Sequence, residues 1–131
     1  MNSTYWKNEV LSSVYLTGGR QFYIGLSSTV PQPDGSGVNE PDGGSYERVA
    51  LTSLYLAADG LISNEETISF PTSTAAWFNG EEILMCYVIF DGKTKDARVL
   101  SYETLMPQRN IGIDVTIKLP ADTLQVELLD G

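Results

Sequence analysis

The sequence predicts an all-β fold, an antiparallel β-sandwich or jelly-roll-like single domain with a short N-terminal helix. Three observations lead to this prediction. About seven or eight short segments are apolar or alternate between apolar and polar residues, and turn residues separate them roughly every 8 to 12 positions. Only the first segment has helical spacing. The 131 residues show no linker and no internal repeat, so one domain over 1–131 is expected.

The N-terminal segment 1–19 is the part expected to be helical. Its apolar residues recur every three or four positions, at Trp6, Val10, Leu11, Val14 and Tyr15. This spacing predicts a helix between Ser3 and Leu16, which Gly18-Gly19 ends. Two roles are open for the helix: docking to a partner through Trp6, Val10 and Val14, or covering the open end of a β core that spans 20–131.

The middle of the chain is expected to be extended, with one long loop. Gln21–Ser28 and Tyr46–Leu56 are predicted strands, and the loop 29–45 between them is rich in Pro, Gly and Asp, which favour turns. Residues 63–66 are interpreted as a polar approach to a brief strand, Thr67–Phe70. The eight apolar residues Ile83–Phe90 predict a strand covered on both faces, inside a sandwich or under a subunit contact.

The C-terminal third carries the most regular patterns. Ala97–Leu105 is a strand candidate, and apolar residues alternate strictly with polar ones from Ile111 to Leu119. The turn residues 120–122 then lead into a further alternating segment, Leu124–Leu128. This pattern predicts a hairpin with one buried face.

Composition excludes several classes of function. The chain has 17 acidic and 8 basic residues and a net charge of −9, which opposes binding to nucleic acid. Histidine is absent, which removes the commonest general base and transition-metal ligand. The single cysteine, Cys86, is expected to be buried and cannot form an intrachain disulfide, so synthesis in a reducing cytoplasm is expected. No apolar run approaches the roughly 18 residues of a membrane span, so no membrane insertion is predicted.

Several segments, in order, resemble small tail fibre proteins of tailed phages and prophages. YIGLSSTVP and DGSGVNEPDGGSYERVA are similar to the first strand and long loop of that family. NEETISFPTSTAAWF and VIFDGKTKDARVLSYETL are similar to its central segment, and VTIKLPADTLQVELLDG stands where its closing hairpin lies. The resemblance covers about residues 20 to 130. It implies a virion structural protein of a tail fibre or baseplate, made in the cytoplasm of the bacterial host, that assembles as a homo-oligomer, for example a trimer, and with other phage structural proteins.

The acidic residues offer two weak candidates for a site. Asp34, Glu40 and Asp42 in the long loop could supply oxygen ligands to Ca²⁺, but their spacing misses the EF-hand pattern and a solvated loop is the better interpretation. The adjacent pairs Glu65-Glu66 and Glu81-Glu82 suit glycoside hydrolysis poorly, because neighbours in a strand point to opposite faces. We therefore predict no catalytic, cofactor-binding or metal-binding residue, and no enzyme.

Aromatic residues are the other candidates, as stacking surfaces for sugars or anchors for protein contacts. The set comprises Tyr5, Trp6, Tyr23, Tyr46, Tyr55, Trp77, Phe78 and Tyr102. Core packing is the default for most of them, and Trp77 and Phe78 are the preferred interface candidates. Tyr46 and Arg48, which close the long loop, are further candidates, although Arg48 could simply pair with an acid of the loop.

Three functions stay open at this point. The first is a tail fibre or baseplate component that acts by protein assembly and by possible contact with a host surface glycan. The second is a capsid decoration protein on the phage head. The third is a carbohydrate-binding or depolymerising module, which requires an aromatic-lined groove.

Overall fold

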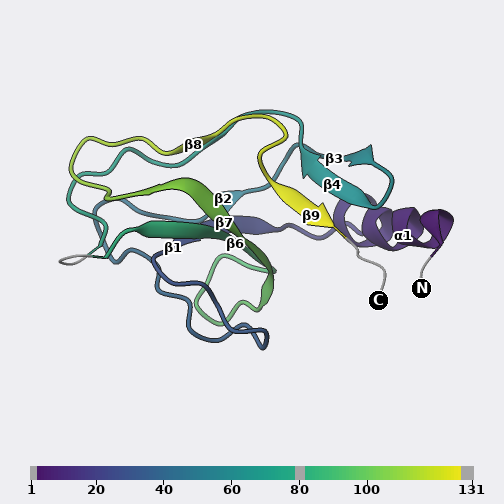
Figure 1. Cartoon of the computed structure of the whole chain (residues 1–131), viewed down its shortest axis with the longest axis horizontal. Helices are drawn as coiled ribbons and strands as arrows, with labels where there is room; N and C mark the ends of the chain where they lie inside the picture. Colours follow the sequence, from purple (N-terminus) through teal and green to yellow (C-terminus); the bar gives the residue numbers. More distant parts are fainter. Residues whose placement is uncertain (1–2, 79–81, 128–131) are drawn as a thin grey trace. The chain divides into compact units, whose positions relative to one another are not determined.

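The computed structural model describes residues 3–78 and 82–127, with residues 106–109 described by their backbone alone. It consists mainly of strands in antiparallel sheets, with a short α-helix near the N-terminus (Figure 1), so the predicted all-β class is confirmed. The chain divides into two compact units. The first contains residues 1–21, 51–68 and 119–131, and the second contains residues 22–50 and 69–118. The single domain over 1–131 stays a prediction, and the two units are described separately.

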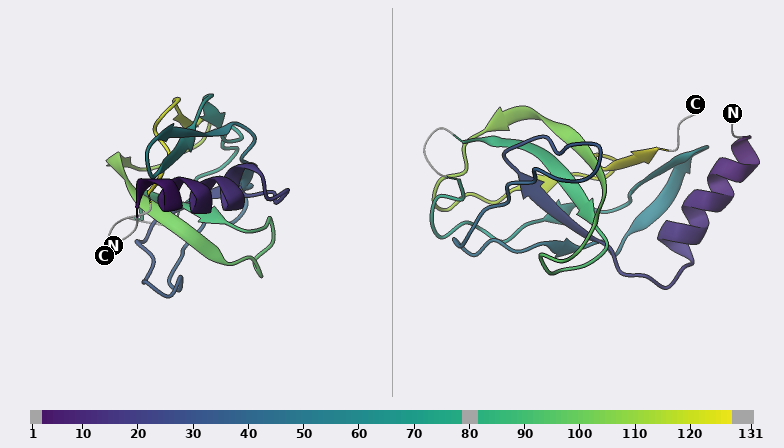
Figure 2. Two further views of the ribbon diagram at one scale, coloured as in Figure 1. Left: turned by 90° about the vertical axis from the view of Figure 1, so that its right-hand side faces the viewer. Right: turned by 90° about the horizontal axis from the view of Figure 1, so that it is seen from below.

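The first unit begins with the predicted helix. Helix α1 (Thr4–Leu11) is followed without a break by one π-helical turn, η1 (Ser12–Leu16). The Ser3 hydroxyl caps the helix by accepting a hydrogen bond from the backbone N–H of Trp6 at 3.2 Å. Leu11 is the buried residue of the helix. The Asn8 side chain accepts a hydrogen bond from the N–H of Gly60, which holds α1 beside the turn between strands β3 (Leu54–Ala58) and β4 (Leu61–Asn64) (Figure 2).

The first unit also contains a three-stranded sheet in the order β3-β4-β9. Its strands are β3 (Leu54–Ala58), β4 (Leu61–Asn64) and β9 (Gln125–Glu127). Two predictions were wrong here. Residues 63 and 64 belong to a buried strand and not to a polar approach, and β9 pairs with β4 instead of closing a hairpin with the segment before it. The predicted turn at 120–122 does form, since the N–H of Thr123 donates to the Pro120 carbonyl at 3.1 Å.

The second unit is built on a four-stranded sheet in the order β2-β1-β6-β7 (Figure 1). The strands are β1 (Tyr23–Ser27), β2 (Val49–Ala50), β6 (Leu84–Phe90) and β7 (Val99–Arg109). Strand β6 contains most of the predicted apolar run, and all its residues except Met85 are buried. These residues are already buried within the single chain, so no subunit contact is required to cover the run. Cys86 is buried in this strand, as expected.

The prediction of a strand over Ile111–Leu119, the most regular pattern, is wrong for most of these residues. Only β8 (Lys118–Leu119) is a strand, and it pairs with β5 (Ile68–Ser69). The backbone of Asp114 has a φ of 60°, which lies outside the extended region and breaks the alternation, so that Ile113 is 65% exposed. Irregular backbone hydrogen bonds to the segment 70–77 replace the ladder, including one from Trp77 to the Ile111 carbonyl at 3.0 Å.

Candidate functional site

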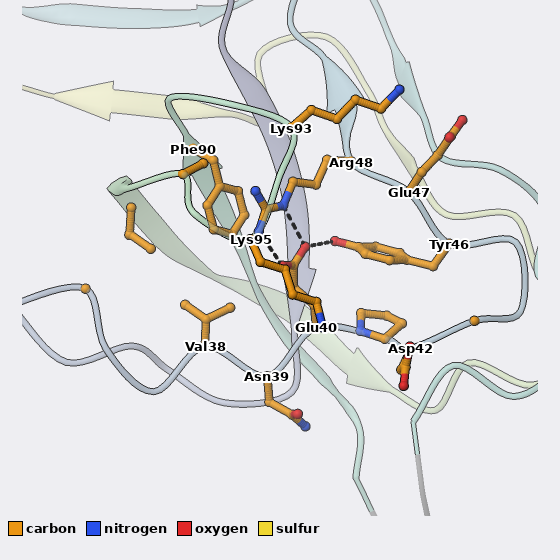
Figure 3. Close-up of a pocket in the computed structure, with 15 residues that line it drawn as sticks. Val38, Asn39, Glu40, Asp42, Tyr46, Glu47, Arg48, Phe90, Lys93 and Lys95 are labelled. Atoms are coloured by element: carbon orange, nitrogen blue, oxygen red, sulfur yellow. Dashed lines mark hydrogen bonds and ion pairs between the residues drawn. The ribbon is translucent and has the colours of Figure 1, made fainter.

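Three side chains at the end of the long loop, Glu40, Tyr46 and Arg48, form a connected polar network. Arg48 binds Glu40 with two parallel hydrogen bonds, Nε to Oε2 at 3.0 Å and Nη2 to Oε1 at 2.6 Å. The Tyr46 hydroxyl donates to Glu40 Oε2 at 2.5 Å and accepts from the backbone N–H of Leu26 in β1 at 3.0 Å. Figure 3 shows the Glu40 carboxylate between the guanidinium and the phenol. The expected pairing of Arg48 with a loop acid is therefore confirmed.

Arg48 also holds a second loop in place. Its Nη1 donates to the carbonyls of Gly92 at 3.1 Å and Thr94 at 2.7 Å, in the turn that follows β6. The guanidinium carbon lies 3.5 Å from the centre of the Phe90 ring, a cation–π contact. One side chain thus joins the long loop, the end of β6 and the turn after it.

Gly25 in β1 leaves room for this network. A Cβ atom at this position would lie 2.7 Å from the Tyr46 hydroxyl, 2.9 Å from Glu40 Oε2 and 2.9 Å from the Phe90 ring. A glycine inside a strand often marks such a close approach of other groups. The glycine in YIGLSS is therefore required by the charged network that packs over the strand.

The network is largely removed from solvent. The Arg48 and Glu40 side chains are 6% and 18% exposed. Burial, and then the negative charge and hydrogen bond of Glu40, raise the pKa of the Tyr46 phenol well above its ordinary value. Tyr46 therefore stays neutral and donates a hydrogen bond to Glu40. The bidentate Arg48–Glu40 pair orders the loop with defined geometry.

Trp77 and Phe78 lie in the interior of the second unit. Their exposed fractions are 3% and 8%, which removes them from its surface as sugar-stacking platforms. The Trp77 ring packs edge-on against Tyr46 with centroids 5.3 Å apart, and its Nε1 donates to the Gly44 carbonyl at 2.8 Å. These contacts hold the end of the loop, at Gly44 and Tyr46, next to the network around Arg48. An interface role for these residues stays a prediction.

A hollow of about 710 Å³ lies over the network, between the long loop and the turn after β6 (Figure 3). One side is apolar, with Val38, Phe90, Ala97 and Val99. The charged side chains that line it are Glu40, Asp42, Glu47, Arg48, Lys93 and Lys95. Sequence reasoning missed Phe90, Lys93 and Lys95 as neighbours of the loop, because they follow it by more than forty residues. Gly25 carried a readable signal, since glycine is unusual inside a strand.

The acidic candidates do not gather into a site. Among the residues that the structure describes, no group of three or more Cys, Asp or Glu side chains is placed to hold a metal ion. Asp34 accepts hydrogen bonds from the hydroxyl and N–H of Ser36, which lower the pKa of its carboxyl. Glu65 and Glu66 are exposed, and Glu82 accepts a hydrogen bond from Asn39 at 2.7 Å. Glu81 lies outside the described residues.

The candidate contact residues of α1 and η1 differ in exposure. Trp6 is 55% exposed and its neighbour Tyr5 is 73% exposed, whereas Val10 and Val14 are partly buried. No helix within the described ranges combines the length and the apolar character that crossing a bilayer requires.

Fold and site together define a small all-β protein in which a buried side-chain network fixes a surface loop. A family model described as Podophage GP4 fiber I protein gp80 matches residues 2–127. The chain therefore belongs to this family of phage fibre proteins, and the resemblance to tail fibre proteins is confirmed. The family indicates a structural component of a virion. No curated protein matches the chain significantly.

Proposed function

We propose that this protein is a structural subunit of a phage tail fibre or its baseplate attachment, acting by assembly with copies of itself and with other virion proteins, without catalysis. The observation that carries the proposal is the match to a fibre protein family over residues 2–127. The geometry agrees with a structural role, because the polar network around Arg48 is a satisfied ion pair that orders a loop.

The exposed aromatic pair on α1 supports assembly through the N-terminal helix. Tyr5 and Trp6 are neighbours and are both more than half exposed. Tyr and Trp supply large contact areas at low entropic cost and are enriched among the residues that dominate binding energy. Burial of β6 inside its own sheet leaves this helix as the better candidate for a subunit contact.

Immunogold electron microscopy of the parent phage, with antibody to this protein, tests the position in the virion. Label on the tail fibres or the baseplate is the expected result. Label spread over the head would overturn the proposal and indicate a capsid decoration protein. Absence of label, together with absence of the protein from purified virions by mass spectrometry, would exclude a structural component.

Light scattering on the purified protein tests assembly through α1. We expect an oligomer at micromolar concentration, and Trp6→Ser should shift it toward monomer because an aromatic anchor is lost. Ile113→Ser is the matched control, since Ile113 is 65% exposed but lies in the other unit. A monodisperse wild-type monomer, or equal effects of both changes, would contradict the role of α1.

A further inference from the structure

Two hollows of the second unit adjoin each other. The one described above measures about 710 Å³, and its neighbour measures about 520 Å³. Glu47, Arg48 and Lys93 line both hollows. The second hollow is completed by Tyr23, Val49, Ala50, Ser69, Phe70 and Pro71. Because Glu47, Arg48 and Lys93 line both, the two hollows are neighbours that share a wall, and the pair of hollows is called the groove below.

Four charged side chains of the groove are available for a ligand. Asp42, Glu47, Lys93 and Lys95 are exposed, and within the described parts of the chain their side chains have no hydrogen bond or ion pair. Figure 3 shows the side chains of Lys93 and Glu47 directed away from the Arg48–Glu40 pair. The opposite charges of Arg48 and Glu40 cancel each other. The four remaining groups are two acids and two bases, so the lining carries both signs in balance.

Tyr23 provides an aromatic surface at the far end of the groove. It lies in β1 opposite Phe90 of β6, two residues before Gly25, so it shares the face of the sheet on which the network packs. Its side chain is half-buried, and its hydroxyl has no hydrogen-bond partner among the residues that the structure describes. Phe90, by contrast, is covered by the Arg48 guanidinium. Tyr23 therefore offers a ligand an aromatic ring in the second hollow.

We propose that this groove binds a neutral oligosaccharide. A sugar hydroxyl both donates and accepts hydrogen bonds, so it can use the carboxylates of Asp42 and Glu47 together with the ammonium groups of Lys93 and Lys95. The apolar face of a sugar ring packs on the Tyr23 ring. The balanced charge of the groove, in a chain of net charge −9, disfavours anionic ligands. The inference deepens the proposed function, on which it rests, by giving the fibre subunit a class of surface ligand.

The test is binding of the purified full-length protein to a microarray of neutral and acidic oligosaccharides, followed by titration calorimetry with the best neutral one. Glu47→Gln and Lys93→Met should each weaken binding about tenfold, since each removes one charge-assisted hydrogen bond while leaving the fold intact. Glu103→Gln and Lys118→Met are the matched controls, because both residues are exposed and line neither hollow. The controls should change affinity less than about twofold.

Three results would overturn the inference: no neutral oligosaccharide bound, acidic ones alone bound, or equal loss of affinity in the groove variants and the controls. Tyr23→Phe distinguishes stacking from hydrogen bonding, because it keeps the ring and should retain most of the affinity. The position of the protein in the virion is measured separately by immunogold labelling. Label on the fibre without saccharide binding would reject the groove and leave the proposed function in place.

Discussion

At the scale of single residues, the Arg48 side chain connects the long loop, the end of β6 and the turn after it. Its guanidinium donates two hydrogen bonds to Glu40, lies over the Phe90 ring and donates hydrogen bonds to two backbone carbonyls. Burial of such an ion pair costs desolvation energy, so the intact pair is a modest source of stability. Removing one partner is much more costly, because the other charge then stays buried without compensation.

Glu40→Gln is therefore expected to lower the free energy of unfolding by about 3 kcal/mol. The substitution keeps the shape of the side chain but leaves Arg48 without its counter-charge. Urea unfolding monitored by circular dichroism measures the loss. Asp91→Asn is the matched control: its partner Arg98 is 88% exposed. Because the Arg98 side chain lies in solvent and needs no counter-charge there, this substitution should change stability by less than about 1 kcal/mol. Equal losses would show that burial of the Arg48 pair has no energetic consequence.

Tyr46 predicts an alkaline dependence of stability. Its pKa is raised in the folded state by burial and by Glu40, whereas the unfolded phenol titrates near its ordinary value of about 10. Above pH of about 10 the unfolded chain loses a proton that the folded chain keeps, so stability falls as pH rises, by up to about 1.4 kcal/mol per pH unit. Below that pH this contribution is fully present. Tyr46→Phe should flatten the alkaline limb in urea unfolding between about pH 9 and 11, and identical slopes would contradict the assignment.

At the scale of elements, side chains and not strand pairing give the long loop its shape. The Ser27 hydroxyl accepts hydrogen bonds from the N–H groups of Thr29 and Asn39, both at 3.1 Å, which brings the start of the loop to its middle. The Ser28 N–H donates to the Asn39 carbonyl at 3.0 Å. Buried Ser27 thus closes the first half of the loop, and the Arg48 network closes the second.

In the first unit, Asn64 at the end of β4 likewise fixes a turn by side-chain hydrogen bonds. Asn64 is fully buried, and its Nδ2 donates to the carbonyls of Glu66 at 2.8 Å and Pro120 at 3.0 Å. Its Oδ1 accepts from the Leu124 N–H at 2.9 Å. One amide therefore joins the end of β4 to the turn before β9.

Asn64→Ala should lower the free energy of unfolding by about 2 to 4 kcal/mol, because a buried backbone N–H and two partly buried carbonyls lose their partner. Differential scanning calorimetry measures the accompanying fall in melting temperature. Asn110→Ala, at an exposed position, serves as the control and should change stability by no more than about 0.5 kcal/mol. A small effect at Asn64 would mean that water replaces the amide in this turn.

At the scale of the whole molecule, the two units are interleaved along the chain. The chain passes from one unit to the other at 21/22, 50/51, 68/69 and 118/119. The first unit is assembled from three separate segments, whose ends the second unit must bring together. Closing such long connections costs entropy, which is lower once the second unit is folded. Folding of the two units is therefore expected to be coupled.

Equilibrium unfolding should show one cooperative transition, in agreement with the single domain predicted over 1–131. Each unit contains one tryptophan, Trp6 in the first and Trp77 in the second. In a Trp6→Phe variant the fluorescence reports on the second unit alone, while far-ultraviolet circular dichroism reports on both. Coincident midpoints are expected for a single transition. Two separate midpoints would show that the units unfold independently.

Local pattern was sufficient for part of this fold. The helix at Ser3–Leu16 follows from spacing and an N-terminal cap, and burial of β6 follows from an apolar run bounded by turns. The alternation at 111–119 was misleading, because a single left-handed backbone at Asp114 interrupts a pattern that local reading treats as continuous. The interpretation of Ser63 and Asn64 as part of a polar approach was wrong, since their burial in a strand depends on partners some sixty residues away.

The amino-acid sequence alone was enough to predict the all-β class, the N-terminal helix, the absence of histidine chemistry and the likeness to phage fibre proteins. These properties depend on composition and on the order of short segments, which are local in the chain. Three other features became clear in the folded structure. Strand β9 pairs with β4, and Trp77 is internal. Arg48 joins Glu40 to Phe90 and to the turn after it. These contacts join residues far apart in the sequence, and only the balance of burial and hydrogen bonding in the folded chain selects them.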